Sequence, residues 1–234
     1  MKIIITMAGL GSRFKEVGYT VPKHEIVIKD KTLFEWSLLS LIDFFDEEFI
    51  FITRKNAYDL NFIEKICYKL KIKNYKIKEL VHLTDGQAST AFLCNDLISE
   101  NENVLIYNID TYIKEYSILK SQIKEYDGFI PVFKAEGEKW SFIKLNENNE
   151  VVDVVEKIRI SDLASIGLYY FKNWKDYRKI YLSHREEIRN NFKEVYIAPM
   201  YKYLLQENKK IGYMILKKED VHILGTPEDL KDFI

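Results

Sequence analysis

The first 23 residues, MKIIITMAGLGSRFKEVGYTVPK, constrain the fold more than any other stretch of the chain. Lys2–Thr6 is an apolar, β-branched run that is too short for a helix, so we expect a buried strand of the kind found in parallel sheets. Gly9 and Gly11 follow shortly after it. Glycines in this position let backbone N–H groups approach a phosphate without interference from a Cβ atom. The stretch therefore predicts a strand that leads into a phosphate-binding loop.

Two familiar phosphate loops do not fit this stretch. A Walker A loop would end in Gly-Lys-Ser/Thr, but Ser12-Arg13 stands at that place. A dinucleotide-binding fingerprint needs a third glycine, and Phe14 occupies its position. What remains is a glycine-rich loop that contains Arg13, whose guanidinium suits phosphate oxygens, followed by Pro22-Lys23. The alternative is an ordinary strand and turn with solvated basic side chains.

Strand-like and helix-like segments alternate along the first half of the chain. We expect strands at Lys2–Thr6, Ile26–Ile28, Glu48–Thr53, Tyr75–Val81 and Val104–Asn108, and helices at Leu33–Phe45, from Asn56 to about Leu70, at Thr84–Ile98 and at Tyr116–Tyr126. This order predicts a parallel sheet with crossover helices.

After Gly128 the pattern changes to strand-like runs joined by short polar turns, which suit antiparallel pairing. We expect strands at Phe129–Ala135, Trp140–Leu145, Val151–Glu156 and Ser165–Phe171, helices at Trp174–Phe192 and Ile197–Glu207, late strands at Ile211–Leu216 and Val221–Leu224, and a short terminal helix from Thr226. No linker interrupts the chain, so we expect one domain over residues 1–234, with halves of about 1–127 and 128–234.

Composition excludes several classes of protein. The formal net charge is -1, with 35 basic and 36 acidic residues, so nothing global suggests nucleic acid and any phosphate-binding charge must be local. Cys67 and Cys94, each inside an expected helix, suggest a reducing compartment without a disulfide framework. No apolar run approaches the roughly 18 residues of a membrane span, and the first strand leaves no room for a signal peptide. We expect a cytoplasmic protein without membrane contact.

Polar residues at the ends of expected elements are candidates for a site. Asp110 follows the strand VLIYN, where ligands bind in open α/β sheets, and its carboxylate suits Mg²⁺; a helix cap or a solvated turn is the alternative. Gly86-Gln87-Ala88-Ser89 stands at the start of an expected helix, where a helix cap is one interpretation and a ligand site is the other. Glu156-Lys157 ends a strand, and Gly167 would allow close approach of a ligand or of backbone.

Two other kinds of site are excluded. The four histidines are scattered and no pair has metal-ligand spacing, so we do not expect zinc. No serine lies in a nucleophile-elbow pattern, so we do not expect a hydrolase triad.

In their order and spacing these segments resemble the nucleotidyltransferases of the sugar-nucleotide pyrophosphorylase type, particularly the capsule-biosynthesis branch. Tyr196-Ile-Ala-Pro199 and Leu224-Gly-Thr-Pro-Glu-Asp229 extend the resemblance to the C-terminus. It implies a Rossmann-like, three-layer α/β fold of the GT-A-like kind, with a mostly parallel central sheet and a smaller antiparallel part on the acceptor side. Residues 1–127 would then form a nucleotide-binding half, and residues 128–234 an acceptor-binding half.

The resemblance also implies roles for individual residues. The segment from Gly86 would recognise the base, and Gln87 would make a two-point amide contact with a pyrimidine edge. The nucleotide would bind Met7, Ala8, Gly9, Leu10, Gly11, Ser12, Arg13, Lys23, Gly86, Gln87, Ala88 and Ser89, and the acceptor Glu156, Lys157, Arg159 and Gly167. The catalytic residues would be Arg13, Lys23, Asp110 and Lys157, with Asp110 as a ligand of Mg²⁺.

The chain departs from the family pattern at two places. Ile223 stands where many members have a second metal-binding Asp, so Asp220 is our substitute. His24 and Ile158 replace the prolines that often follow the two key lysines, which makes an unusual acceptor plausible; Arg159 would bind a second anionic group of such an acceptor or be solvated.

The implied activity is Mg²⁺-dependent transfer of a nucleoside monophosphate from a pyrimidine NTP, CTP before others, to a phosphorylated small acceptor, with release of pyrophosphate, in capsular or surface polysaccharide biosynthesis. One alternative is a sugar-1-phosphate nucleotidyltransferase that uses dTTP or UTP. A GT-A glycosyltransferase is another, because Asn108-Ile109-Asp110 is close to the Asp-x-Asp metal motif of that class. A non-catalytic nucleotide-binding module is a third. The sequence leaves the oligomeric state open, a homo-oligomer included.

Overall fold

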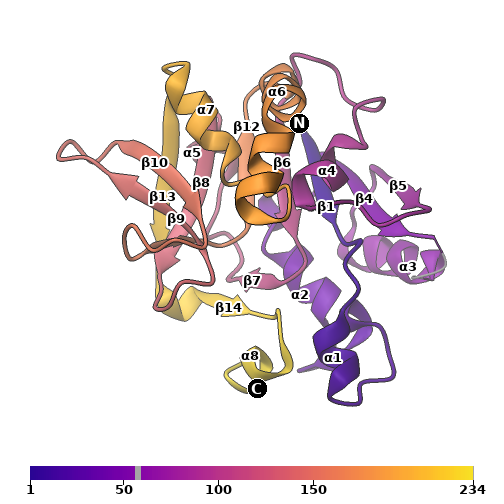
Figure 1. Ribbon diagram of the computed structural model, residues 1–234. Coiled ribbons are helices and arrows are strands. Elements are labelled where there is room, and N and C mark those ends of the chain that lie inside the picture. Colours follow the sequence, from indigo (N-terminus) through magenta and orange to yellow (C-terminus); the bar gives the residue numbers. More distant parts are fainter. Residues whose placement is uncertain (56–58, 234) are drawn as a thin grey trace.

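A mixed sheet of ten strands forms the centre of the computed structural model, which describes residues 1–55 and 59–233 (Figure 1). In spatial order the strands are β10 (Val151–Glu156), β9 (Ser141–Leu145), β11 (Leu163–Ser165), β8 (Gly128–Lys134), β12 (Leu168–Phe171), β6 (Val104–Asn108), β1 (Lys2–Thr6), β4 (Glu48–Arg54) and β5 (Tyr75–Leu80), and β13 (Ile211–Leu216) pairs with β8.

The strands of the N-terminal half, β6, β1, β4 and β5, are parallel to one another. Thr6 at the end of β1 lies opposite Ile52 of β4 and Asn108 of β6, so the carboxyl ends of these strands share one edge of the sheet. Strand β12 then pairs antiparallel with both β6 and β8, and through it the C-terminal half continues the same sheet. The predicted α/β fold is confirmed, and the expected antiparallel part belongs to the same central sheet, which is mixed.

Helices cover both faces of the sheet because its central strands are apolar on both sides. Side chains alternate along a strand, so Ile3 and Ile5 enter one core and Ile4 enters the other. The first core contains residues of α2 (Leu33–Leu39), α3 (Leu60–Leu70) and α5 (Lys120–Ile123), and the second contains residues of α4 (Gln87–Phe92), α6 (Trp174–Phe192) and α7 (Met200–Gln206). The result is the expected three-layer arrangement.

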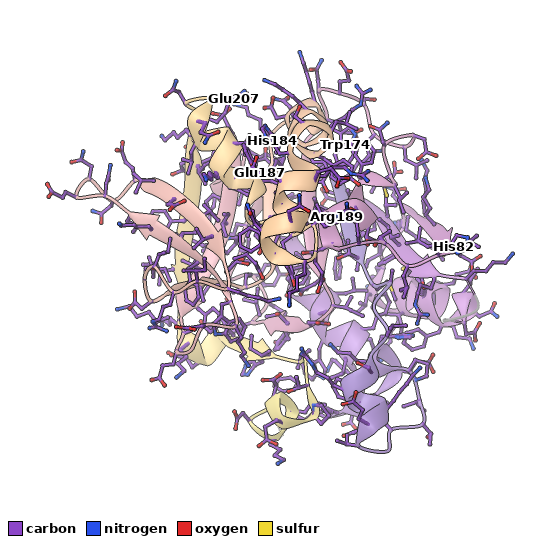
Figure 2. The ribbon with its side chains drawn as sticks, in the orientation of Figure 1. His82, Trp174, His184, Glu187, Arg189 and Glu207 are labelled. Atoms are coloured by element: carbon purple, nitrogen blue, oxygen red, sulfur yellow. The ribbon has the colours of Figure 1, made fainter. Side chains whose placement is uncertain are left out.

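The long helix α6 shows how the helices over the second core are held in place (Figure 2). Trp174 at its start is 1% exposed and stacks on Tyr177, with ring centroids 4.5 Å apart. Further along, His184 stacks on Tyr203 of α7 at 3.7 Å, whereas Glu187 is exposed. The helix therefore binds the sheet and α7 through one face and ends near residue 193, at the carboxyl edge of the parallel strands.

A third, smaller core joins the two ends of the chain. It contains Phe14 of α1 (Ser12–Glu16), Leu224, and Leu230 in α8 (Pro227–Lys231), and all three are buried. The C-terminal segment reaches this place through β14 (Val221–Ile223), which pairs antiparallel with β7 (Thr111–Ile113). Figure 1 shows α1 and α8 at the same end of the molecule.

Two helices are shorter than the sequence predicts, because tertiary contacts outweigh helix propensity. The helix expected over Thr84–Ile98 is reduced to α4, and Asn95 beyond it accepts a hydrogen bond from the indole of Trp174 at 3.0 Å. The helix expected over Tyr116–Tyr126 is reduced to α5, since Tyr116 has a left-handed φ of 60° that no helix accommodates.

Two expected elements are divided in the structure. The helix expected over Leu33–Phe45 is α2 followed by a 3-10 turn, η2 (Ile42–Phe44), because Leu41 between them has a φ of -108° and a ψ of 24°, outside the helical region. The strand expected over Ser165–Phe171 is divided into β11 and β12 at Gly167, which has a φ of 82°.

The remaining differences concern short elements. The expected cap Asn56 lies outside the described residues, and α3 is capped by Asp59, whose carboxylate accepts the N–H of Asn61 at 3.0 Å. The short strands β2 (Val27–Ile28) and β3 (Lys31–Thr32) form a separate hairpin. Of the cysteines, Cys67 lies in α3 as expected, but Cys94 lies just after α4; both are buried thiols. Among the described helices, none is long and apolar enough to cross a membrane.

Gly167 allows a stability test of the junction between the two halves. A Cβ atom at this position would lie 2.3 Å from Nδ2 of Asn108, in addition to the strain of the positive φ. We expect Gly167→Ala to lower the free energy of unfolding by about 2–4 kcal/mol, as measured by urea denaturation. Gly137→Ala is the matched control, because Gly137 has a φ of 77° and open space around it, so only the backbone strain of about 1 kcal/mol applies. Equal losses in the two variants would contradict the packing argument.

Candidate active site

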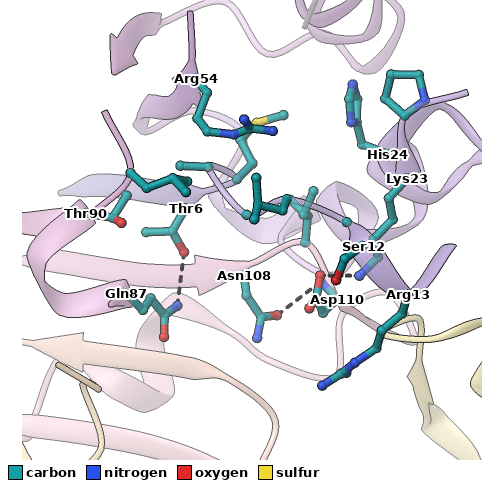
Figure 3. A pocket seen from close by; sticks show the side chains of 18 of the residues that line it. Thr6, Ser12, Arg13, Lys23, His24, Arg54, Gln87, Thr90, Asn108 and Asp110 are labelled. Atoms are coloured by element: carbon teal, nitrogen blue, oxygen red, sulfur yellow. Dashed lines mark hydrogen bonds and ion pairs between the residues drawn. The ribbon is translucent and has the colours of Figure 1, made fainter. Parts of the chain in front are cut away.

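A cleft of about 890 Å³ lies at the carboxyl edge of β1, β4 and β6 (Figure 3), the edge at which open α/β sheets bind ligands. It is lined by residues 6–15, 20–24, 54–55, 83–87, 90, 108–110, 193–194 and 225. The cleft thus brings together the whole glycine-rich loop, Lys23, Gly86, Gln87 and Asp110.

The glycine-rich loop presents its backbone to this cleft. Met7 at its start donates its N–H to Ile52 of β4 at 3.0 Å, and Phe14 at its end, 1% exposed, donates to Gly11 at 3.2 Å. Between these anchors the N–H groups of residues 8–11 donate to no other described backbone carbonyl. These N–H groups are therefore available to phosphate oxygens, and the buried ring of Phe14 holds the loop in place.

Lys23 and Asp110 form an ion pair beside the loop. Lys23 Nζ lies 2.5 Å from Asp110 Oδ1, and the N–H of Asp110 donates to the side-chain oxygen of Asn108 at 3.2 Å. The side chain of Lys23 is 12% exposed and that of Asp110 is 49% exposed. Figure 3 shows Arg13 and Ser12 at the same end of the cleft. One end of the site therefore holds two cations and one accessible carboxylate.

Positive charge is concentrated in the cleft although the whole chain is nearly neutral. Its lining contains six cationic side chains and three carboxylates: Arg13, Lys15, Lys23, Arg54, Lys55 and Lys193 against Asp85, Asp110 and Glu194. His24 adds no charge at neutral pH, because burial and the neighbouring Lys23 lower its pKa to about 3. The lining therefore favours a polyanion. Sequence reasoning missed Arg54, Lys55, Lys193 and Glu194, since single charges after a strand or helix form no motif.

The other end of the cleft is built around Gly86. Its φ is 149°, and a Cβ atom there would lie 2.5 Å from the backbone of Val195. The close approach is held by two hydrogen bonds, from Val195 to the carbonyl of Asp85 at 2.7 Å and from Ala88 to the carbonyl of Val195 at 2.9 Å. The segment after α6 therefore fixes the loop before α4, and it carries Lys193 and Glu194 into the cleft.

Gln87, the first residue of α4, lines the cleft at this end. Its Nε2 donates to the hydroxyl of Thr6 at 3.1 Å (Figure 3). This bond occupies one amide N–H and fixes the orientation of the amide, which the predicted two-point contact did not anticipate. The structure does not bring Ala88 or Ser89 to the cleft: Ala88 is fully buried, and the hydroxyl of Ser89 pairs with that of Tyr181 at 3.1 Å.

Glu156, the last residue of β10, and Lys157 after it lie outside the lining of this cleft, but Lys157 contacts the segment that borders it. Lys157 Nζ donates to the hydroxyl of Tyr196 and lies 4.4 Å from the centre of its ring. Burial lowers the pKa of Lys157, but the bond to Tyr196 and the nearby Glu156 and Glu194 outweigh it and raise the pKa overall. Burial raises the pKa of Glu156, whose carboxyl pairs with Ser141.

Arg159 and Gly167 serve the fold in this structure. Arg159 Nη1 donates to the carbonyls of Ala135 at 2.9 Å and Gly137 at 3.0 Å, so the guanidinium holds the loop after β8. Gly167 makes room for the side chain of Asn108. A larger residue at this position would displace Asn108, whose side-chain oxygen accepts the N–H of Asp110.

Asp220, our substitute for a second metal ligand, is not brought to Asp110. The two residues lie at opposite ends of the ribbon that β7 and β14 form: Leu224 donates to the carbonyl of Asp110 at 2.6 Å, and Lys114 donates to that of Asp220 at 2.9 Å. Several residues at about 3.3 Å each separate these ends, too far for one shared ion. The carboxylate of Asp220 instead faces Lys114 Nζ at 3.7 Å. We therefore remove Asp220 from the metal site.

Asp110 by itself fits a magnesium ion that arrives with a nucleotide. Among the described residues, no three His, Cys, Asp or Glu side chains are arranged to hold a metal. Mg²⁺ in nucleotide sites is commonly held by one or two carboxylates together with substrate phosphates, and its remaining positions are filled by water. A single accessible carboxylate beside a phosphate-binding loop meets this requirement.

Comparisons with known proteins agree with this geometry. A sequence model of the nucleotidyl transferase family matches residues 2–233. A UTP–glucose-1-phosphate uridylyltransferase of Haemophilus ducreyi is 23% identical over 214 residues, which cover 73% of this chain and 72% of that protein. A choline-phosphate cytidylyltransferase of Streptococcus pneumoniae is 23% identical over 236 residues, which cover 82% of this chain and 99% of that protein.

Solved structures resemble the chain over its full length. A nucleoside-diphosphate-sugar pyrophosphorylase from Vibrio cholerae has a TM-score of 0.89 and 34% identity, and the match covers 100% of this chain and 99% of that one. The inositol-1-phosphate CTP transferase from T. maritima shares the fold, with a TM-score of 0.74, 18% identity and coverage of 97% and 90%. This chain belongs to the nucleotidyl transferase family.

Proposed function

We propose that this nucleotidyltransferase transfers a nucleoside monophosphate from a pyrimidine NTP, CTP before others, to a phosphorylated small acceptor and releases pyrophosphate. The observation that carries the proposal is the Lys23–Asp110 ion pair beside the glycine-rich loop, at the carboxyl ends of β1 and β6. This end of the cleft combines backbone N–H groups, cations and one carboxylate, which is what a triphosphate and its Mg²⁺ require. Residues 1–127 would bind the nucleotide, and residues 128–234 the acceptor.

In this mechanism an oxygen of the acceptor phosphate attacks the α-phosphorus of the NTP in line. The bond from the α-phosphorus to the bridging oxygen breaks, and pyrophosphate leaves with that electron pair. No side chain needs to act as a nucleophile, because the acceptor phosphate is already ionised. The protein therefore contributes positioning and charge neutralisation.

Each group of the site has a part in this positioning. The loop N–H groups, Arg13 and Lys23 would hold the β- and γ-phosphates and stabilise the leaving group. Asp110 would hold Mg²⁺, which supplies charge neutralisation at the α-phosphate when bound. Lys157, kept cationic by its surroundings, would orient the acceptor phosphate.

The choice of CTP rests on the names of two relatives, and the choice of acceptor on the resemblance to the capsule-biosynthesis branch. Two proteins that this chain resembles, from S. pneumoniae and T. maritima, are named for cytidylyl transfer, whereas the H. ducreyi protein is named for UTP and a sugar phosphate. We put phosphorylated glutamine first among the acceptors because the sequence resembles the capsule-biosynthesis branch. The proposal in its finest form is thus a CTP:phosphoglutamine cytidylyltransferase, and a sugar-1-phosphate enzyme that uses UTP or dTTP is the alternative.

A pyrophosphate-release assay tests the activity directly. Purified protein with Mg²⁺ is offered each common NTP together with sugar 1-phosphates, phosphocholine or phosphorylated glutamine. We expect release with CTP and one phosphorylated acceptor, and loss of release when EDTA removes the metal. Release with UTP or dTTP and a sugar phosphate would select the alternative. Hydrolysis of a nucleotide sugar without pyrophosphate would instead identify a glycosyltransferase, and NTP binding without any turnover a binding module.

The two aspartates of the β7–β14 ribbon allow a matched test of the metal site. We expect Asp110→Asn to lower turnover by about 10²–10³-fold, because Asp110 is the only carboxylate that the described residues bring to the phosphate end of the cleft. Asp220→Asn makes the same chemical change at the other end of the ribbon and should leave turnover within a factor of about two. Melting temperatures of both variants check that the fold is retained. Similar losses in the two variants would contradict our assignment of Asp110.

Lys157 provides a test of the acceptor side. We expect Lys157→Met to raise the KM for the acceptor by about 10- to 100-fold, because a charge-assisted hydrogen bond to phosphate is lost, and to leave the KM for the NTP nearly unchanged. The control is Lys139→Met, which removes a neighbouring cation that stacks on Trp140 at 4.8 Å. An equal change in both KM values, or the same result for the control, would remove Lys157 from the acceptor site.

A further inference from the structure

The ion pair of Lys23 and Asp110 engages the same carboxylate that the proposed function assigns to Mg²⁺. Lys23 Nζ lies 2.5 Å from Asp110 Oδ1, and no other cation of the described residues lies within ion-pair distance of this carboxylate. An ammonium group and a divalent ion on one carboxylate stand only a few ångströms apart, where like charges repel unless further anions lie between them. Lys23 and Mg²⁺ therefore compete for Asp110.

Lys23 is the partner that is able to move. Its Cβ lies beside the glycine-rich loop, 3.5 Å from the place where a Cβ of Gly11 would stand. Because its stem is long and flexible, the ammonium group can turn from Asp110 to phosphates on the loop while the backbone stays in place. Asp110 is held instead: its carbonyl accepts the N–H of Leu224 at 2.6 Å, and its own N–H donates to Asn108 at 3.2 Å.

Separation of the pair leaves each partner in need of a new counter-charge. The side chain of Lys23 is only 12% exposed, and Asp110 is the one carboxylate among the described residues that pairs with it. A largely buried ammonium group without a counter-ion is costly. When Asp110 holds Mg²⁺, a phosphate on the loop is the anion within reach of Lys23. When Lys23 turns to a phosphate, Asp110 is free to hold Mg²⁺, so the metal and the nucleotide favour each other.

We infer that Lys23 exchanges partners: it pairs with Asp110 until this carboxylate holds Mg²⁺, and only then does it hold the phosphates of the nucleotide. The pair thereby makes the site selective for the magnesium complex of an NTP over the free nucleotide and over the free metal. The coupling is reciprocal, since any gain in nucleotide affinity from the metal equals the gain in metal affinity from the nucleotide. The inference rests on the proposed function and describes how the same site admits its substrate.

Calorimetric titration with CTP, once with Mg²⁺ and once with EDTA, tests the exchange without any acceptor. The double substitution of Lys23→Met with Asp110→Asn removes the whole pair and keeps the net charge. With EDTA this variant should bind CTP within about 3-fold of the wild-type chain, because Lys23 then holds Asp110 and not phosphate. With Mg²⁺ it should bind CTP at least about 100-fold more weakly, because the metal ligand and a charge-assisted bond to phosphate are both lost.

The single substitution Asp110→Asn should change CTP binding in opposite directions under the two conditions. With EDTA it should strengthen binding by about 10-fold, because it releases Lys23 to the phosphates. With Mg²⁺ it should weaken binding, because the metal ligand is lost. Adding Lys23→Met to this variant should then cost about 10- to 100-fold even with EDTA.

Arg13 supplies the matched control. It lines the same end of the cleft, is exposed, and forms no ion pair with a carboxylate of the described residues. Arg13→Met should therefore weaken CTP binding by a similar factor with Mg²⁺ and with EDTA. The same metal dependence in Arg13→Met as in the Lys23 variants would assign the effect to the charge of the nucleotide and would overturn the exchange. Melting temperatures confirm that each variant is folded.

Two further results would overturn the inference. A loss of about 10-fold or more in the double variant with EDTA would show that Lys23 contacts phosphate whether or not Asp110 holds a metal. Asp110→Asn that binds CTP more weakly than the wild-type chain with EDTA, or too weakly to measure, would show that release from Asp110 does not make Lys23 available.

The outcome for the exchange is separable from the outcome for the activity. Inorganic tripolyphosphate repeats the titrations with a ligand that has no base, so the result does not depend on the choice of CTP. If Lys23 shows the expected metal dependence but no acceptor gives pyrophosphate release, the exchange stands and the proposed transfer fails. If pyrophosphate is released and Lys23 contributes equally with Mg²⁺ and with EDTA, the transfer stands and the exchange is overturned.

Discussion

Strand β1 is buried on both of its faces, and its position between β4 and β6 determines where every group of the site lies. Because Ile3, Ile4 and Ile5 are all fully buried, a slip by one residue would exchange apolar side chains for apolar side chains and cost little burial. The ends of the strand specify the register instead. Lys2 pairs with Glu48 of β4 at 2.6 Å, and the carboxyl end carries Thr6 and its bond from Gln87. This register brings the loop after β1 and the residues after β6 to one edge.

The C-terminal half then completes a site that the N-terminal half begins. Residues 193–196 bond to the loop at Gly86 and contact Lys157 through Tyr196, so one short segment touches both the nucleotide cleft and the proposed acceptor side. The C-terminal strand β14 bonds to the carbonyl of Asp110 through Leu224. The two halves, which we propose to bind the nucleotide and the acceptor, therefore depend on each other for the geometry of the site.

The parts of the site that the sequence predicts are those that local pattern determines. The loop at residues 7–13 and Asp110 each follow an unbroken apolar strand, and parallel strands with helical crossovers must end at a common edge. Strand and helix type followed from periodicity in the same way, with β1, β6, β10, β13 and α6 found at the expected bounds. The lengths of α4 and α5 could not be predicted from periodicity, because they depend on contacts between distant residues, such as that of Asn95 with Trp174.

The remaining residues acquire their roles only through pairing between distant segments. Asp220 was our substitute for a second metal ligand beside Asp110, but antiparallel pairing of β14 with β7 puts the two residues at opposite ends of the ribbon. Gly167 is spaced for close approach, and what approaches is Asn108, which in turn holds the N–H of Asp110. Arg54 is one charge among many in the sequence, and the position of β4 beside β1 brings it to the cleft. In each case the residue type is visible in the sequence, and the register of two strands decides what it touches.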